Sequence, residues 1–341
     1  MAIVGGLDIH RRQITFDVLD TETGDVRRGR IGGVTRQRFR RWLGQFAGQE
    51  VDLACEGCTG WRFVVEEIQR AGFRAHLAEP ADTAALRGKK RRAKTDGTDS
   101  RLMREALVQG RLPESWIPPT QVLEVRARVR LYKTLIDMRR QWEQRIHAVL
   151  FHQGLPAVEQ SLVKVKDEIL AHPGLTPAAR EQVAVAYRMI DHATAELVPL
   201  HRALAAFARR QRGCRALIDA HFGIGTVVSV AVWSEMGDPR RFSSSDQAVR
   251  HTGLDVTVHS SDGKRTGRAR LARQGPPTLR WALYEAGKCG ARATSPDHNY
   301  YTAVKDRLGG NRAAMSVARK LARRSYHTLR ELGDAAYEPV G

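Results

Sequence analysis

The sequence predicts an α/β domain at the N-terminus and a largely helical remainder. In the first part of the chain, short apolar runs alternate with helical patterns, which is typical of a sheet covered by helices. In the middle, apolar residues recur at three- and four-residue steps over two long segments, which indicates amphipathic helices. The last part is again mainly helical in pattern. We therefore predict three regions, residues 1–118, 119–213 and 214–341.

The N-terminal region contains an ordered succession of strand and helix patterns. Apolar and alternating runs predict the strands, and apolar residues on one side of a helical turn predict the helices. In chain order, the predicted strands are residues 2–7, 14–19, 28–32, 51–55 and 74–78, and the predicted helices are residues 39–46 and 63–72. Three strands, a helix, a strand, a helix and a strand form the order of an RNase H-like mixed sheet.

A basic segment, residues 86–94, separates this sheet from the next helix. We expect this segment to be a mobile loop when neither metal nor nucleic acid is bound. The helix that follows begins at Asp96. A group of prolines then marks the end of the region, because proline interrupts regular structure; these are Pro113, Pro118 and Pro119.

The middle region is predicted to contain two long helices. The first carries an apolar stripe and ends near Gly154; the stripe consists of Leu123, Ala127, Leu131, Leu135, Met138, Trp142, Ile146 and Val149. The second runs over residues 177–212, with an interruption expected at Pro199 because proline lacks an N–H. An antiparallel hairpin within one chain and a coiled coil that dimerises and grips a nucleic-acid backbone both fit this pattern.

The C-terminal region begins with a glycine-containing turn. Gly223 and Gly225 flank Ile224 at the entrance to a helical pattern, as in the hairpin of a helix-hairpin-helix element. The backbone N–H groups of such a turn can contact a phosphate, although a tight turn without a ligand fits equally well. Residues 253–258 then resemble a strand that leads into a polar loop, and further helices are expected to about Leu332.

The charge of the chain favours a polyanionic partner. There are 56 Lys and Arg residues against 37 Asp and Glu residues, a formal net charge of +19, and the pI is about 10.5. Because the basic residues are clustered, we expect nucleic acid as the partner. The predicted nucleic-acid-binding residues are Lys89, Lys90, Arg91, Arg92, Lys94, Arg139, Arg140, Lys264, Arg265 and Arg268. Neither a membrane-spanning run nor a signal segment is present in the sequence, so we expect a cytoplasmic protein associated with the nucleoid.

The cysteines do not predict a metal site or a disulfide framework. Cys55 and Cys58 form a C-x-x-C pair, but Cys214 and Cys289 do not form the second pair that a four-ligand zinc site requires. Small buried side chains beside a strand end are the favoured interpretation.

Four acidic residues form the candidate active site. Asp8 and Glu56 each follow an apolar strand pattern, and Asp96 and Asp99 stand three residues apart on one helix face. Carboxylates in this arrangement hold Mg²⁺ or Mn²⁺, and two such ions roughly 3.5–4 Å apart support in-line displacement at phosphorus. Asp96 and Asp99 alone would also suit a helix N-terminus, where acids favour the helix dipole. Together with Asp8 and Glu56, they indicate metal binding.

Several motifs resemble the insertion-sequence-110 family of DEDD transposases. Residues 94–100 (KTDGTDS) resemble the family's K-T-D-x-x-D-A motif, and residues 6–10 (GLDIH) resemble its G-x-D-x-x start. Residues 56–61 (EGCTGW) are similar to its E-A-T-G-x-Y segment. The C-terminal positions that follow the family pattern are Gly223, Ile224, Gly225, Phe242, Gly253, Leu254, Ser261, Gly275, Leu279, Arg280 and Leu283.

This resemblance implies a RuvC-like N-terminal domain, a helical coiled-coil middle and a C-terminal transposase domain. It implies a metal-binding tetrad of Asp8, Glu56, Asp96 and Asp99, and a nucleophilic serine that maps to Ser261, with Ser260 as the alternative. It further implies a covalent phosphoserine intermediate and guidance by a structured bridge RNA. Donor and target DNA would be joined in a homo-oligomer, a dimer or tetramer, with the tetrad from one subunit and the serine from another.

Three other functions remain open from the sequence. A hydrolytic endonuclease of the Holliday-junction-resolvase type would use the tetrad and water without a covalent adduct. A non-catalytic nucleic-acid-binding protein would retain its function when Asp8 and Asp99 are replaced by Asn. A sugar-kinase-like ATPase shares an Asp on its first strand, but the sequence lacks convincing phosphate-binding glycine loops and its basic charge argues against it.

Overall fold

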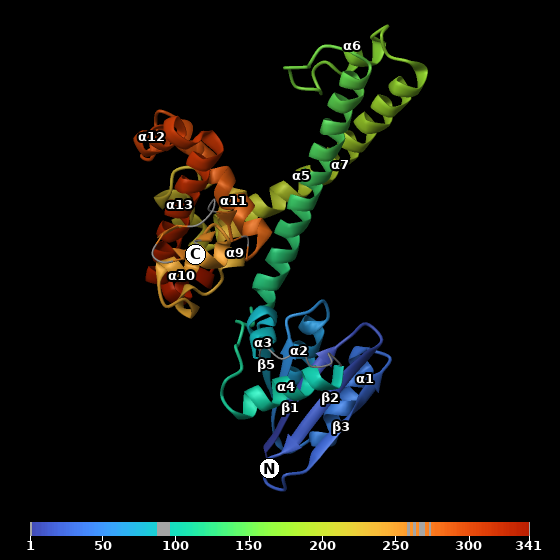
Figure 1. Ribbon diagram of the computed structural model, residues 1–341, viewed down its shortest axis with the longest axis vertical. Coiled ribbons are helices and arrows are strands. Elements are labelled where there is room, and N and C mark those ends of the chain that lie inside the picture. The colour runs from blue at the N-terminus through green and yellow to red at the C-terminus, as the bar shows by residue number, and fades with distance from the viewer. Residues whose placement is uncertain are drawn as a thin grey trace. The chain divides into compact units, whose positions relative to one another are not determined.

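The computed structural model describes residues 2–86, 96–257, 260–261, 264–265, 270–272 and 274–340. The chain divides into two compact units, residues 1–117 and 118–341, which are described separately (Figure 1). The long helical pair and the C-terminal helices belong to the second unit. A further boundary near residue 213 therefore stays a prediction.

The first unit is built on a five-stranded mixed sheet. The strands are β1 (Ala2–Ile9), β2 (Gln13–Asp20), β3 (Val26–Gly32), β4 (Glu50–Glu56) and β5 (Arg74–Ala78), in the order β3-β2-β1-β4-β5. β1 pairs antiparallel with β2 and parallel with β4, and β4 pairs parallel with β5. This arrangement confirms the predicted RNase H-like sheet.

Helices cover both faces of this sheet. They are α1 (Arg36–Leu43), η1 (Gly44–Phe46), α2 (Trp61–Arg70), α3 (Pro80–Ala85) and α4 (Asp96–Val108). Because side chains alternate along a strand, Ile3 and Leu7 of β1 reach one face, where they join a core with Phe39 of α1 and Ile68 of α2. Gly6 lies on the other face, against α4.

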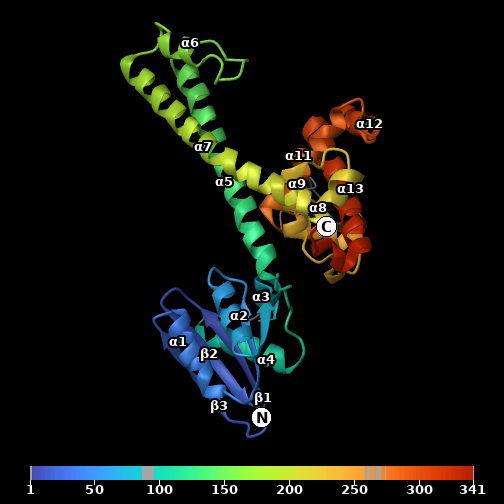
Figure 2. The ribbon, with the colours of Figure 1, turned by 180° about the vertical axis from the view of Figure 1, so that it is seen from behind.

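The second unit begins with a helical hairpin. α5 (Thr120–His152) and α7 (Pro177–Arg210) run in opposite directions and pack on each other, with the short helix α6 (Lys166–Ala171) between them in the chain (Figure 2). α7 is continuous through Pro199, so the predicted interruption there is wrong. Pro199 and Ala195, whose carbonyl loses its helical partner, are both exposed, so water can satisfy that carbonyl.

The C-terminal helices surround α9, which is buried along most of its length. The helices are α8 (Arg212–Ala220), α9 (Thr226–Met236), η2 (Pro239–Arg241), α10 (Ser245–Thr252), α11 (Pro277–Lys288), η3 (Cys289–Ala291), α12 (His298–Leu308), α13 (Gly310–Leu332) and η4 (Gly333–Tyr337). The turn between α8 and α9 contains Gly223 and Gly225, which fits both a helix-hairpin-helix element and a tight turn without a ligand. Glu235 of α9 is buried and pairs with Arg130 of α5, Nε to Oε1 at 2.7 Å.

Short strands occupy the segment after α10. β6 (Val256–Thr257) pairs with β9 (Arg270–Leu271), and β7 (Ser260–Ser261) pairs with β8 (Lys264–Arg265), all antiparallel. Across the described residues of both units, every helix is too short or too polar to cross a bilayer.

Replacing Gly6 by Ala is expected to loosen α4 from the sheet. A Cβ at Gly6 would lie 2.0 Å from the Ser100 carbonyl oxygen and 2.8 Å from the Arg104 amide nitrogen, both backbone atoms of α4. We expect a destabilisation of about 1–3 kcal/mol or more, with faster hydrogen exchange in β1 and α4. As a control, Gly44→Ala meets no atom within 4 Å at a right-handed helical φ of −59° and should change stability by less than about 1 kcal/mol. Equal stability of the two variants would contradict this packing.

Candidate metal centre

The parallel pairing of β1 and β4 brings two of the predicted acids to one edge of the sheet. Leu7 of β1 is in register with Cys55 of β4, so Asp8 and Glu56 are the next residues along these neighbouring strands. Both side chains are partly buried. Because equivalent ends of parallel strands meet at the same edge, this register places the two carboxylates at the same end of the sheet.

The packing of α4 on β1 brings the third acid to Asp8. His10 lies between them: its Nε2 is 3.1 Å from Asp8 Oδ2 and 3.3 Å from Asp96 Oδ1. Gln13, at the start of β2, donates from Nε2 to Asp96 Oδ2 at 3.0 Å. Asp96 is the first residue of α4, where a carboxylate also interacts favourably with the helix dipole.

Two features fix α4 in this position. The first is Gly6, whose lack of a side chain lets the backbone of α4 approach β1 closely. The other is a buried ion pair across the helix–sheet contact, Arg104 Nε to Asp17 Oδ1 at 2.6 Å. Asp17 also accepts from Arg28 Nε of β3 at 2.7 Å. A charge-assisted network of this kind restrains orientation more strongly than apolar contacts do.

The electrostatics connect Asp99 and Glu56 to the same site. Burial raises the pKa of Asp8; His10 lowers it, and the charges of Asp96 and Asp99 raise it further. Burial likewise raises the pKa of the Cys58 thiol, and the charges of Asp8 and Glu56 add to that rise. The structure thus joins Asp8 and Asp96 through His10, whereas Asp99 and Glu56 are connected to this edge only through their charges. That all four acids hold a common ion stays a prediction.

The donor set fits a divalent cation. One ligand atom from each of Asp8, His10 and Asp96 lies within 4.8 Å of the other two. Carboxylates that repel one another are stabilised when a cation lies between them. Carboxylate oxygens are ligands that suit Mg²⁺ and Mn²⁺.

Sequence reasoning missed two groups at this edge, His10 and Gln13. His10 stands two residues after Asp8 and directly after the end of β1 at Ile9, where continued strand alternation would put both side chains on the same face. That signal was available in the sequence. Gln13 reaches the site because the β1–β2 turn is tight, with the His10 amide donating to the Gln13 carbonyl at 2.9 Å.

The other predicted residues lie elsewhere or outside the described part of the chain. Ser261 is in register with Lys264, and Ser260 with Arg265, in the β7–β8 pair of the second unit. Arg139 Nε lies 3.5 Å from Glu143 Oε1, and an Arg140 guanidinium nitrogen lies 3.6 Å from Glu285 Oε1. The predicted basic residues outside the described residues are Lys89, Lys90, Arg91, Arg92, Lys94 and Arg268.

Addition of Mg²⁺ or Mn²⁺ to metal-free protein is expected to raise its melting temperature. Binding to the folded state alone adds about 2.7 kcal/mol at one hundred times Kd. Asp96→Asn should lose most of this response in calorimetry, because it removes a charged ligand. The matched control is Asp82→Asn, an exposed acid of α3, which should respond like the wild type. An undiminished response in Asp96→Asn would exclude this residue as a ligand.

Comparison with known proteins identifies the family. The profile of the DEDD transposase domain of the IS110 family, described as a transposase, matches residues 5–152. The profile described as Transposase IS116/IS110/IS902 family matches residues 215–302, and the two together cover more than half of the chain. A Sinorhizobium fredii (strain NBRC 101917 / NGR234) protein described as "Putative transposase y4qE" is 26% identical over 200 residues. That alignment covers 57% of this chain and 47% of the relative, so it spans about half of the relative's length. The chain belongs to the IS110 family of transposases.

Proposed function

We propose that this chain is a DNA transposase that cuts and rejoins DNA strands at a divalent-metal site. Asp8, Glu56, Asp96 and Asp99 would hold the ion or ions. The observation that carries the proposal is the convergence of Asp8 and Asp96 on His10, from a strand and a helix far apart in the chain. Family membership supports phosphodiester strand transfer as the reaction at this cluster.

The protein side chains prepare the site for this chemistry. Bound Mg²⁺ or Mn²⁺ supplies charge stabilisation and orients the attacking and leaving oxygens. Asp8 is mostly buried, with its side chain 13% exposed, whereas Asp96 is 39% exposed. Asp8 would therefore form the inner wall of the site and Asp96 the side that faces the DNA. In the absence of metal, His10 would offset the repulsion between them.

Ser261 is proposed as the nucleophile. Its oxygen would form a bond to the scissile phosphorus, the bond from phosphorus to the leaving strand oxygen would break, and that oxygen would take the proton. The product is a covalent phosphoserine intermediate, which a second strand can attack. The register of Ser261 with Lys264, a cation suited to a phosphate, supports this role. Ser260 is the alternative, beside Arg265.

The proposed partners are donor DNA, target DNA and a structured bridge RNA. The net charge of +19 supports polyanionic partners. Following the family resemblance, we propose a homo-oligomer in which one subunit supplies the tetrad and another the serine. Such an enzyme would act in the cytoplasm, on the nucleoid.

A hydrolytic endonuclease of the RuvC-like type is the second candidate. The observation that favours it is that the carboxylate cluster lies entirely within the first unit. Metal-activated water could then cleave DNA without the serine. The two functions differ in whether a covalent protein–DNA adduct forms.

Neutralising the cluster is expected to abolish strand cleavage and joining. Asp8→Asn and Asp96→Asn should each lower the rate roughly 10²-fold or more, because each removes several kcal/mol of charge stabilisation. DNA binding, measured by mobility shift, should change little. The assay is recombination of a plasmid that carries the DNA flanking the gene, with Asp82→Asn as the control. Full activity in Asp8→Asn would favour a non-catalytic nucleic-acid-binding protein.

Denaturing gels with end-labelled DNA test the serine. The wild-type protein should give a covalent protein–DNA band that is lost in Ser261→Ala and kept in Ser260→Ala. Loss in Ser260→Ala alone would move the nucleophile to Ser260. Cleavage without any covalent band in the wild type would favour the hydrolytic endonuclease.

A further inference from the structure

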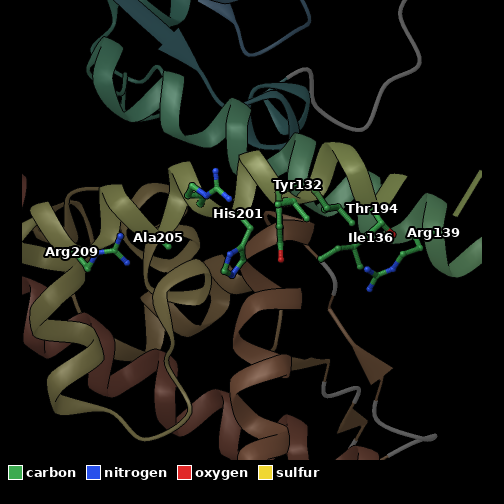
Figure 3. A pocket seen from close by; sticks show the side chains of 10 residues that line it. Tyr132, Ile136, Arg139, Thr194, His201, Ala205 and Arg209 are labelled. Atoms are coloured by element: carbon green, nitrogen blue, oxygen red, sulfur yellow. The ribbon is translucent and has the colours of Figure 1, made fainter. Parts of the chain in front are cut away.

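A groove of about 490 Å³ runs between α5 and α7 in the second unit (Figure 3). None of its lining residues belongs to the carboxylate cluster or to the Ser261 hairpin. Its lining comes from one face of each helix, at positions that recur every three or four residues, with two adjacent pairs on α7. The lining residues are Tyr132, Ile136 and Arg139 from α5, and Thr194, Leu197, Val198, His201, Arg202, Ala205 and Arg209 from α7.

The charge of the groove is positive. Among the lining residues, three are arginines and none is acidic. Arg202 and Arg209 are exposed, and neither has an acidic partner within the described part of the chain. Arg139 has only a long contact with Glu143, at 3.5 Å. The three guanidinium groups can therefore each contact a phosphate without first breaking a strong ion pair.

The groove also carries an aromatic group and an apolar floor. The ring centroids of Tyr132 and His201 are 6.1 Å apart, and Trp281 of α11 lies 6.5 Å from Tyr132. Ile136 and Leu197 are buried and form apolar surface between the helices. Aromatic faces beside arginines bind unpaired bases, whereas a base-paired duplex offers mainly its phosphates.

The spacing of the arginines suits an extended strand. From Thr194 to Arg209 the lining follows α7 for fifteen residues, which at about 1.5 Å per residue is roughly 22 Å. Arg202 and Arg209 lie seven residues apart on this face, about two helical turns. A phosphodiester backbone laid along α7 would pass both guanidinium groups in turn.

We propose that the α5–α7 groove binds a single-stranded segment of nucleic acid. Arg139, Arg202 and Arg209 contact its phosphates, and Tyr132 with His201 stacks on a base. The proposal rests on the proposed function only in that the protein handles nucleic acid; it needs neither the tetrad nor the serine. A second copy of the chain is a poorer occupant, because a two-fold interface across the groove would bring like charges together.

Fluorescence anisotropy of the full chain with a labelled single-stranded oligonucleotide tests this proposal. The measurements are made in EDTA, so that catalysis does not contribute, over a series of salt concentrations. In Arg202→Ala/Arg209→Ala, we expect Kd to rise about tenfold or more. The slope of log K against log salt should decrease in magnitude by about 1.4, because two phosphate contacts are lost at about 0.7 each on a single strand. Arg202→Lys/Arg209→Lys should keep most of the salt-dependence slope, because the charges remain. Tyr132→Ala should raise Kd and leave the slope unchanged.

The matched control is Arg128→Ala/Arg188→Ala, which removes the same charge from exposed positions on α5 and α7 outside the groove. An equal loss of affinity in this control and in the groove variant would overturn the proposal, since it would show a general effect of charge. An equal loss of affinity for duplex and single-stranded probes would also overturn it.

Single-stranded RNA and DNA probes of equal length show which kind of strand binds more tightly. If the groove variant binds both probes with unchanged affinity, the proposal is also overturned. A changed oligomeric state in light scattering, with affinity intact, would assign the groove to a second copy. Because strand binding in the groove needs no catalysis, the groove proposal can be wrong while DNA cleavage persists. Equally, the groove can bind a strand in a protein that does not cleave DNA.

Discussion

The close packing of α4 against β1 is the constraint on which the candidate metal centre depends. Asp8 belongs to the strand and Asp96 to the helix, so their distance is set by how near the two backbones come. Gly6 permits that approach, because any larger residue would meet the backbone of α4. The buried pair of Arg104 and Asp17 then prevents the helix from rotating away. The helix–strand contact that stabilises the unit therefore also positions the carboxylates of the candidate metal centre.

The packing of α4 on β1 also brings the negatively charged carboxylates of Asp8 and Asp96 close together. His10 lies between Asp8 and Asp96, and Gln13 donates to Asp96. Burial and neighbouring carboxylates both raise the pKa of Asp8, so the arrangement is costly without a cation. A divalent ion between these carboxylates would offset their repulsion.

The sequence predicted the sheet and the strand ends that carry Asp8 and Glu56, because both follow from short patterns. The alternation in β2 and the apolar runs of β1 and β4 are local, and parallel pairing then brings Asp8 and Glu56 to one edge. The pair of Arg104 and Asp17 could not be predicted, because its partners are 87 residues apart and no local pattern links them. The interruption predicted at Pro199 was wrong because helix propensity takes no account of solvation. The Ala195 carbonyl, which loses its helical hydrogen bond, is exposed and can bind water instead. The role of Ser261 still rests on the family resemblance.

The most direct test of the metal centre is a double-mutant cycle in Mn²⁺ affinity, measured by electron paramagnetic resonance on the full chain. If Asp8 and Asp96 share one ion, each Asn substitution should weaken binding strongly, and the double variant should lose far less than the sum of the two. Effects that simply add, or a Mn²⁺ affinity that survives both substitutions, would show that these carboxylates do not hold a common ion.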